Sequence, residues 1–176
     1  RPITLPDADG NPTVRAQLRR PLDFTAVTDH AEFLGPIELC TRDSTSLAYW
    51  FPACIATRSD IFYIQLLAAN YWVSLGVLAE SEQKTASFVC ALGDCDAAHR
   101  QAWRHIQAAA EAHYDRSGEC GFTTFVGYEY TDAPDWANLH RNVIFRNATV
   151  TETAISTYDT GSRNVPLPVS YTHLTL

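Results

Sequence analysis

An apolar run near the start of the chain ends in two residues that can bind a metal ion. Residues 22–28 are rich in apolar side chains and lead directly into Asp29 and His30. Such a run is typical of a buried strand. Parallel α/β folds place their reactive groups beyond the C-terminal ends of strands. The run therefore predicts a strand that delivers a carboxylate and an imidazole to a shared crevice.

Two later runs repeat this arrangement. Residues 122–128 lead into Glu129, and His140 comes immediately before the run at 141–145. Carboxylate and imidazole ligands suit a hard-to-borderline divalent cation. The four residues are far apart in sequence, but each lies at the edge of an apolar strand. Together they predict a divalent-metal site.

Each of these residues could also have a purely structural role in place of metal binding. Asp29 and His30 would equally form a strand-end cap that bonds to loop backbone, and His140 would be an exposed edge residue. Glu129 is the only charged residue in 122–131, and burial of a lone carboxylate is costly unless it is paired or binds a metal. Arg141 would be either a surface arginine, which we favour, or a phosphate clamp.

The remaining pattern predicts an α/β fold. The segment 94–116 has apolar residues at helical spacing, and 61–79 is a charge-free run that we expect to be a buried helix packed on the sheet. A turn at 6–12 predicts a small surface excursion of two strands. Residues 31–57 are expected to be irregular or short-helical, broken at Gly35. A helix between strands predicts a parallel sheet.

Three segments also carry a family resemblance: AVTDHAEFLG at 26–35, FVGYEYT at 125–131 and NLHRNVIFRN at 138–147. In this order they resemble the DUF3604 family, and the likeness extends over about residues 1–168. That family is identified as a branch of the polymerase-and-histidinol-phosphatase (PHP) superfamily of metal-dependent phosphoesterases.

The resemblance implies a distorted seven-stranded (β/α)7 barrel that holds two or three divalent ions, such as zinc, manganese or iron. His30, Glu129 and His140 would be metal ligands, with Glu129 able to bridge two ions. Asp29 would be a ligand or a partner that orients an imidazole. The three histidines of segment 94–116 (His99, His105 and His113) receive no site role.

The function implied is hydrolysis of a small-molecule phosphate ester by metal-activated water, because no side chain here is a convincing nucleophile. A binding or envelope-associated module that lacks catalysis is the alternative. Hydrolysis of a non-phosphate bond by the same metal cluster is a third option.

The ends of the chain suggest a fragment. The sequence has no methionine, and the His-x-His and Asp-x-His motifs of the resembled family are not present. We therefore interpret 1–168 as a partial PHP-like domain, truncated at both ends, and 169–176 as a sequencing-adapter tail. Such a fragment is expected to bind metal weakly and to turn over substrate poorly.

The composition argues against two further classes of protein, nucleic-acid binders and membrane-spanning proteins. Hydrophobic content of 46% is that of a globular protein. The net charge of −7 and the pI near 5.2 argue against a nucleic-acid partner. The segment 61–79 approaches membrane-spanning length, but its polar residues and acidic flanks argue against a span.

Five cysteines leave the redox compartment open. In a reducing compartment they would be buried thiols. In an exported protein Cys40 would pair with Cys54, and Cys90 with Cys95 or Cys120. Members of the resembled family often carry export signals, which favours a periplasmic or envelope location over the cytoplasm.

Overall fold

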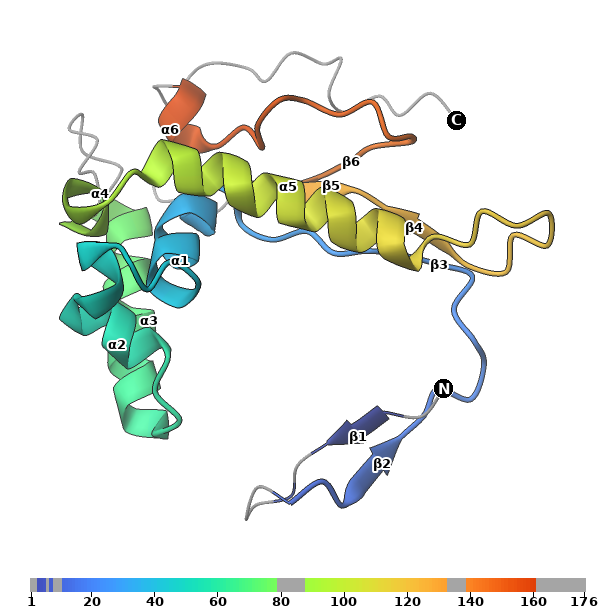
Figure 1. Ribbon diagram of the computed structural model, residues 1–176, viewed down its shortest axis with the longest axis horizontal. Coiled ribbons are helices and arrows are strands. Elements are labelled where there is room, and N and C mark those ends of the chain that lie inside the picture. Colours follow the sequence, from blue (N-terminus) through green and yellow to red (C-terminus); the bar gives the residue numbers. More distant parts are fainter. Residues whose placement is uncertain (1–2, 6, 8–10, 79–87, 133–138, 161–176) are drawn as a thin grey trace.

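The computed structural model describes residues 3–5, 7, 11–78, 88–132 and 139–160 (Figure 1). It is a mixed α/β structure whose elements follow one another in this order: β1 (Ile3–Leu5), β2 (Val14–Ala16), β3 (Phe24–Ala26), a 3-10 turn (Ala31–Phe33), α1 (Leu34–Thr41), a second 3-10 turn (Leu47–Trp50), α2 (Pro52–Thr57), α3 (Phe62–Leu78), α4 (Phe88–Leu92), α5 (Cys95–His113), β4 (Thr123–Phe125), β5 (Gly127–Asp132), β6 (Leu139–Ile144) and α6 (Thr157–Thr160). The adapter-like tail at 169–176 lies outside the described residues.

The strands form three two-stranded pairings rather than one sheet. β3 pairs with β4 in parallel, and β5 pairs with β6 in antiparallel orientation. The predicted parallel sheet is therefore confirmed for β3 and β4 and is wrong for β6. Only residues 133–138 separate β5 from β6, and a link this short cannot make a parallel crossover. The described residues do not form a closed barrel.

The remaining pair, β1 and β2, is antiparallel, as the turn at 6–12 predicts. Figure 1 shows this hairpin apart from the main body of the molecule.

Helix α5 covers the strands and carries the main core. Asp94 begins the helix, and its side chain accepts a hydrogen bond of 2.9 Å from the Ala97 amide. Trp103 is fully buried, with its ring edge-to-face on Tyr128 at 5.7 Å between centroids. Its indole N–H donates to the Thr151 carbonyl oxygen at 2.8 Å. The helix predicted at 94–116 is thus confirmed, although it ends three residues earlier.

Helices α1 to α4 form a second cluster, in which one disulfide joins α1 to α2 and another joins α4 to the start of α5. Cys40 is bonded to Cys54 and Cys90 to Cys95, while Cys120 is free and exposed. These pairs are the ones expected for an exported protein, with Cys95 and not Cys120 as the partner of Cys90. The alternative of five free thiols is wrong for this structure.

Helix α1 runs through the position where a chain break is expected. Gly35 lies in its first turn, where the next residue, Pro36, needs no amide hydrogen bond. A side chain at Gly35 would clash, because its Cβ would lie 2.4 Å from the Cys95 carbonyl oxygen. Glycine therefore permits the close crossing of α1 and α5, and the predicted break at Gly35 is wrong.

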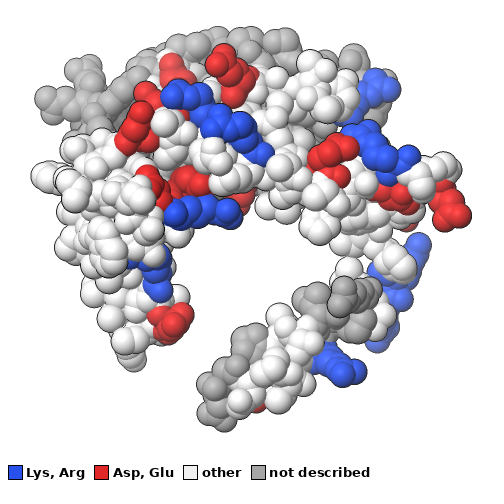
Figure 2. Space-filling view, in the orientation of Figure 1, with Lys and Arg blue, Asp and Glu red and all other residues white. Residues whose placement is uncertain are grey.

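Helix α3 is confirmed as a helix, but it is not buried on the sheet. One side packs through Ala68 and Trp72, and the Trp72 indole N–H donates to Thr57 Oγ1 in α2 at 2.9 Å. The other side exposes large apolar side chains: Phe62, Tyr63, Leu66, Leu67 and Val73. Charged side chains are sparse over α2 and α3 in Figure 2. Within the described residues no helix is long and apolar enough to cross a membrane.

Candidate metal centre

The backbone brings His30 to β5. The chain beyond β3 continues alongside β5, and the Glu129 amide donates to the Asp29 carbonyl oxygen at 2.8 Å. His30 and Glu129 form a parallel bridge as a result. Two residues that are distant in sequence are therefore side by side because the parallel pairing of β3 and β4 extends past its last regular residue.

The register of β5 and β6 supplies the rest of the site. Thr131 is paired with His140, and Glu129 is paired with Asn142. Residues i and i+2 of a strand point to the same face. Glu129, Thr131 and His140 therefore share one face of this hairpin.

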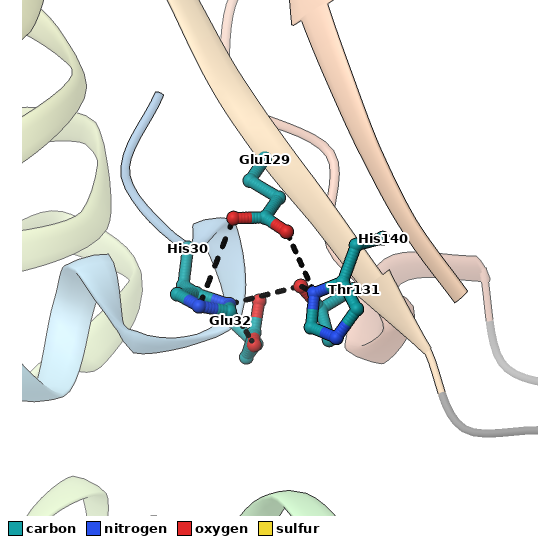
Figure 3. Close-up of polar contacts among 5 residues, drawn as sticks. All are labelled: His30, Glu32, Glu129, Thr131 and His140. Carbon is teal, nitrogen blue, oxygen red and sulfur yellow. Dashed lines mark hydrogen bonds and ion pairs between the residues drawn. The ribbon is translucent and has the colours of Figure 1, made fainter. Parts of the chain in front are cut away.

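Three of the predicted ligands converge. Single ligand atoms of His30, Glu129 and His140 all lie within 4.8 Å of one another. Glu129 Oε1 lies 2.6 Å from His140 Nδ1, and Glu129 Oε2 lies 3.7 Å from His30 Nε2 (Figure 3). The glutamate is thus placed between the two imidazoles, with one oxygen toward each.

This donor set fits a divalent cation. Two nitrogen donors and one carboxylate are a common ligand set for catalytic zinc and related metals. Two ligands that bind one ion through bonds of ~2.1 Å lie at most about 4.2 Å apart. The observed spacing therefore needs only small side-chain rotations. His30 and His140 are both partly exposed, which leaves room for water or substrate beside them.

Asp29 is not part of this group. Neighbouring residues of an extended chain point to opposite faces, and Asp29 is absent from the group whose ligand atoms lie within 4.8 Å of one another. Its contribution to the site is its backbone oxygen, which holds the Glu129 amide. Arg141 is exposed and neighbours His140 along the strand, which fits the favoured surface role.

Sequence reasoning missed Glu32. Its carboxylate is buried, and its Oε1 lies 3.0 Å from His30 Nδ1. Burial raises the pKa of the Glu32 carboxyl, while the neighbouring His30 lowers it. In the tautomer that carries its proton on Nδ1, His30 donates to this oxygen and presents Nε2 to a metal, as in many carboxylate–histidine–metal arrangements. In the sequence, the position of Glu32 two residues after His30 is only a weak indication of this contact.

Thr131 was also missed. Its Oγ1 lies 2.9 Å from His30 Nδ1 and 3.3 Å from His140 Nδ1. The hydroxyl therefore contacts both imidazoles. The alternation of strand residues would have indicated it, because Thr131 follows Glu129 by two positions.

Substitution of Glu32 by glutamine is expected to weaken metal binding by about 10- to 100-fold, the range typical of partners that orient a liganding imidazole. The amide keeps the size of the side chain but loses the charge that supports His30. Calorimetric titration with zinc measures the change, with Glu38→Gln as a control at a glutamate that pairs with His105 instead. Unchanged zinc affinity would show that Glu32 does not orient His30.

The histidines of α5 have other roles. His99 Nε2 lies 2.9 Å from the Ala154 carbonyl oxygen, and burial lowers the pKa of this imidazole. Among the described residues only His30, Glu129 and His140 form a group that could hold a metal ion. Leaving the helical histidines out of the site is therefore consistent with the geometry.

His99 should make the protein sensitive to acid. The unfolded chain protonates His99 near its ordinary pKa of 6.5, before the folded chain does, so the free energy of unfolding falls as the pH drops below that value. Nearby Asp96 and Asp159 oppose the shift, and Arg100 adds to it. We expect His99→Gln to lose less stability than the wild type between about pH 7.5 and 5.5. Urea unfolding at both pH values measures this, and identical losses would contradict it.

Comparison with known proteins adds one finding to this geometry. A family model described as "Protein of unknown function (DUF3604)" matches residues 6–167. The chain belongs to the DUF3604 family. The match includes every residue of the candidate centre, so His30, Glu129 and His140 all lie inside the DUF3604 region. Searches of curated proteins and of solved structures each found no match.

Proposed function

We propose that this DUF3604 protein is a divalent-metal-dependent hydrolase of the PHP type that acts on phosphate esters. The observation that carries the proposal is the convergence of His30, Glu129 and His140 within 4.8 Å. The PHP barrel and its two or three ions are part of the same proposal, which rests on the resemblance of the motifs around these residues. The described group by itself suits one ion.

Each residue of the candidate centre has a distinct role in this proposal. His30, Glu129 and His140 would hold the cation, which when bound supplies a water of lowered pKa and positive charge for the phosphoryl oxygens. Glu32 and Thr131 hold the His30 ring in place through contacts of 3.0 and 2.9 Å to Nδ1. The partly buried Glu129 carboxylate lies between the two imidazoles, with one oxygen toward each.

The test uses the full chain. It is depleted of metal, titrated with zinc, manganese or iron(II), and assayed with an aryl phosphate. Metal binding together with metal-dependent phosphate release supports the proposal, and both are expected to be weak in this chain. Absence of metal binding in folded protein would refute it, since every step depends on the bound cation.

A binding or envelope-associated module is the second candidate. The two disulfides favour it in part, because disulfides persist in oxidising compartments. Export from the cytoplasm is accordingly part of this proposal. The same assay separates the two candidates: metal binding without any release of phosphate from the aryl phosphate would favour the binding module.

A further inference from the structure

Helix α3 keeps a large apolar surface exposed on its outer side. Five of its large apolar side chains are between 48% and 75% exposed: Phe62, Tyr63, Leu66, Leu67 and Val73. At these fractions they present roughly 600 Å² of surface, since an aromatic side chain alone has about 150–250 Å² to expose. The largest apolar patch of a typical monomer covers about 300–600 Å², and patches of this size or larger mark interaction sites.

The exposed side chains have the spacing of a helix–helix contact. Phe62, Leu66, Ala69 and Val73 follow one another at intervals of four, three and four residues, which places them in one line along the outer side of α3. Apolar residues at these intervals form the contact line of two helices in a coiled coil. The outer line therefore has the pattern of a helix that packs against another helix.

The inner side of the same helix shows what such a line does when it is covered. Ala68 is buried, and Tyr71 and Leu75 pack against the core of the helical cluster at the same intervals of three and four residues. A helix that is apolar all round is typically buried all round. The inner line of α3 is covered by its own chain, and the outer line is the one left for a partner.

The outer face is large enough for a stable complex. Small and polar residues that are also exposed lie among the large apolar ones: Gln65, Ala69, Asn70 and Ser74. With them the face offers roughly 800 Å², which is about the area that each partner buries in an interface of standard size.

Two polar side chains of this face already have hydrogen bonds within the helix. Asn70 Nδ2 donates to the Leu66 carbonyl oxygen at 2.8 Å, and Ser74 Oγ donates to the Tyr71 carbonyl oxygen at 2.7 Å. A donor that loses water without gaining a partner is costly to bury. Because these bonds stay inside α3, an apolar partner can cover the face without breaking them.

Charge distinguishes between the possible occupants. The stretch 59–83 contains no Lys or Arg, and acidic residues flank the helix. A helix that lies on a lipid surface typically carries Lys and Arg on its polar face, so a membrane does not fit. A strongly charged protein would lose the water around its charges and gain no ion pair here. A second copy brings an equally uncharged face, since charged side chains are sparse over α2 and α3 (Figure 2).

We propose that α3 is a dimerisation helix, whose outer line packs against the outer line of a second copy about a two-fold axis. Such an interface uses the same patch on both chains, and this patch is complementary to itself in charge and in helical spacing. The net charge of −7 does not oppose the contact, because none of it lies within residues 61–79. The dimer is independent of the metal centre, since no residue of this face belongs to the group of His30, Glu129 and His140.

Sedimentation velocity of the full chain tests the proposal. All samples carry Cys120→Ser, so that the free and exposed thiol cannot link two copies. We expect a monomer–dimer equilibrium with a dissociation constant of about 10 µM or tighter, the range that interfaces of this area reach. A chain that stays monomeric well above this concentration, or one that forms aggregates of unlimited size, would overturn the proposal.

Variants locate the interface. Leu66→Glu should weaken dimerisation by at least about 100-fold, because the dimer would then bury two like charges between apolar side chains. Val73→Glu tests a second position of the same line. The matched control is Leu18→Glu, at a residue that is 62% exposed but lies outside α3, and it should leave the dimer unchanged. All three positions are exposed, so the circular dichroism spectra should match. A dimer that persists in both α3 variants would overturn the assignment.

Vesicle flotation tests the alternative occupant. The probe is a vesicle of phosphatidylcholine and phosphatidylglycerol. A monomer that floats with these vesicles, and no longer does so after Leu66→Glu, would assign the face to a lipid surface and overturn the dimer. A dimer that is lost in Leu66→Glu and retained in Leu18→Glu supports the proposal whatever the vesicles show.

Discussion

Substitution of Glu129 by glutamine is expected to weaken divalent-metal binding by more than about 100-fold, beyond the range seen when only an orienting partner is lost. Glu129 is the central residue of the candidate centre, with one oxygen 2.6 Å from His140 Nδ1 and the other 3.7 Å from His30 Nε2. Glutamine has almost the same shape but supplies no negative charge, and an amide oxygen is a poor ligand for zinc. Zinc titration by calorimetry measures the loss.

The control is Glu119→Gln, an exposed glutamate outside the group of three. Both variants should give the circular dichroism spectrum of the wild type, because neither side chain fills the core. Wild-type zinc affinity in a folded Glu129→Gln protein would remove Glu129 from the centre and leave the proposed function without its main support.

The three candidate ligands could be predicted from sequence because each adjoins an apolar run. Glu129 lies within β5 and His140 within β6, and the pairing of these strands together with the bridge from His30 to Glu129 brings the three side chains together. Glu32 and Thr131 were harder to find. Their roles depend on which face of the chain turns toward His30, and this is decided by the pairing of β3's extension with β5.

The parts that sequence did not predict depend on contacts between distant segments. Helix α3 is apolar on all sides, so no pattern indicates that Trp72 is packed and Leu67 exposed. Asp29 adjoins His30 in sequence but is not in the group of three, because adjacent residues of an extended chain face opposite ways. The direction of β6 followed from the short link after β5 and not from the general α/β pattern.

Truncation of Trp103 to alanine is expected to destabilise the fold by about 3–5 kcal/mol, a large part of the stability of an ordinary domain. Trp103 is 0% exposed and packs against Tyr128 and Phe145 at 5.7 and 6.0 Å between ring centroids. The change leaves a cavity under β5, and it leaves the Thr151 carbonyl oxygen without its indole donor. Urea unfolding followed by circular dichroism measures the loss.

Metal binding should weaken in the same variant, although Trp103 touches no ligand. Tyr128 precedes Glu129 in β5, so a loosened core under Tyr128 releases the strand that carries the central ligand. Trp50→Ala is the matched control, because Trp50 is 62% exposed, and its removal should change stability by less than about 0.5 kcal/mol. A Trp103→Ala protein as stable as Trp50→Ala would show that the contact of α5 with β5 is not the core that holds the metal centre in place.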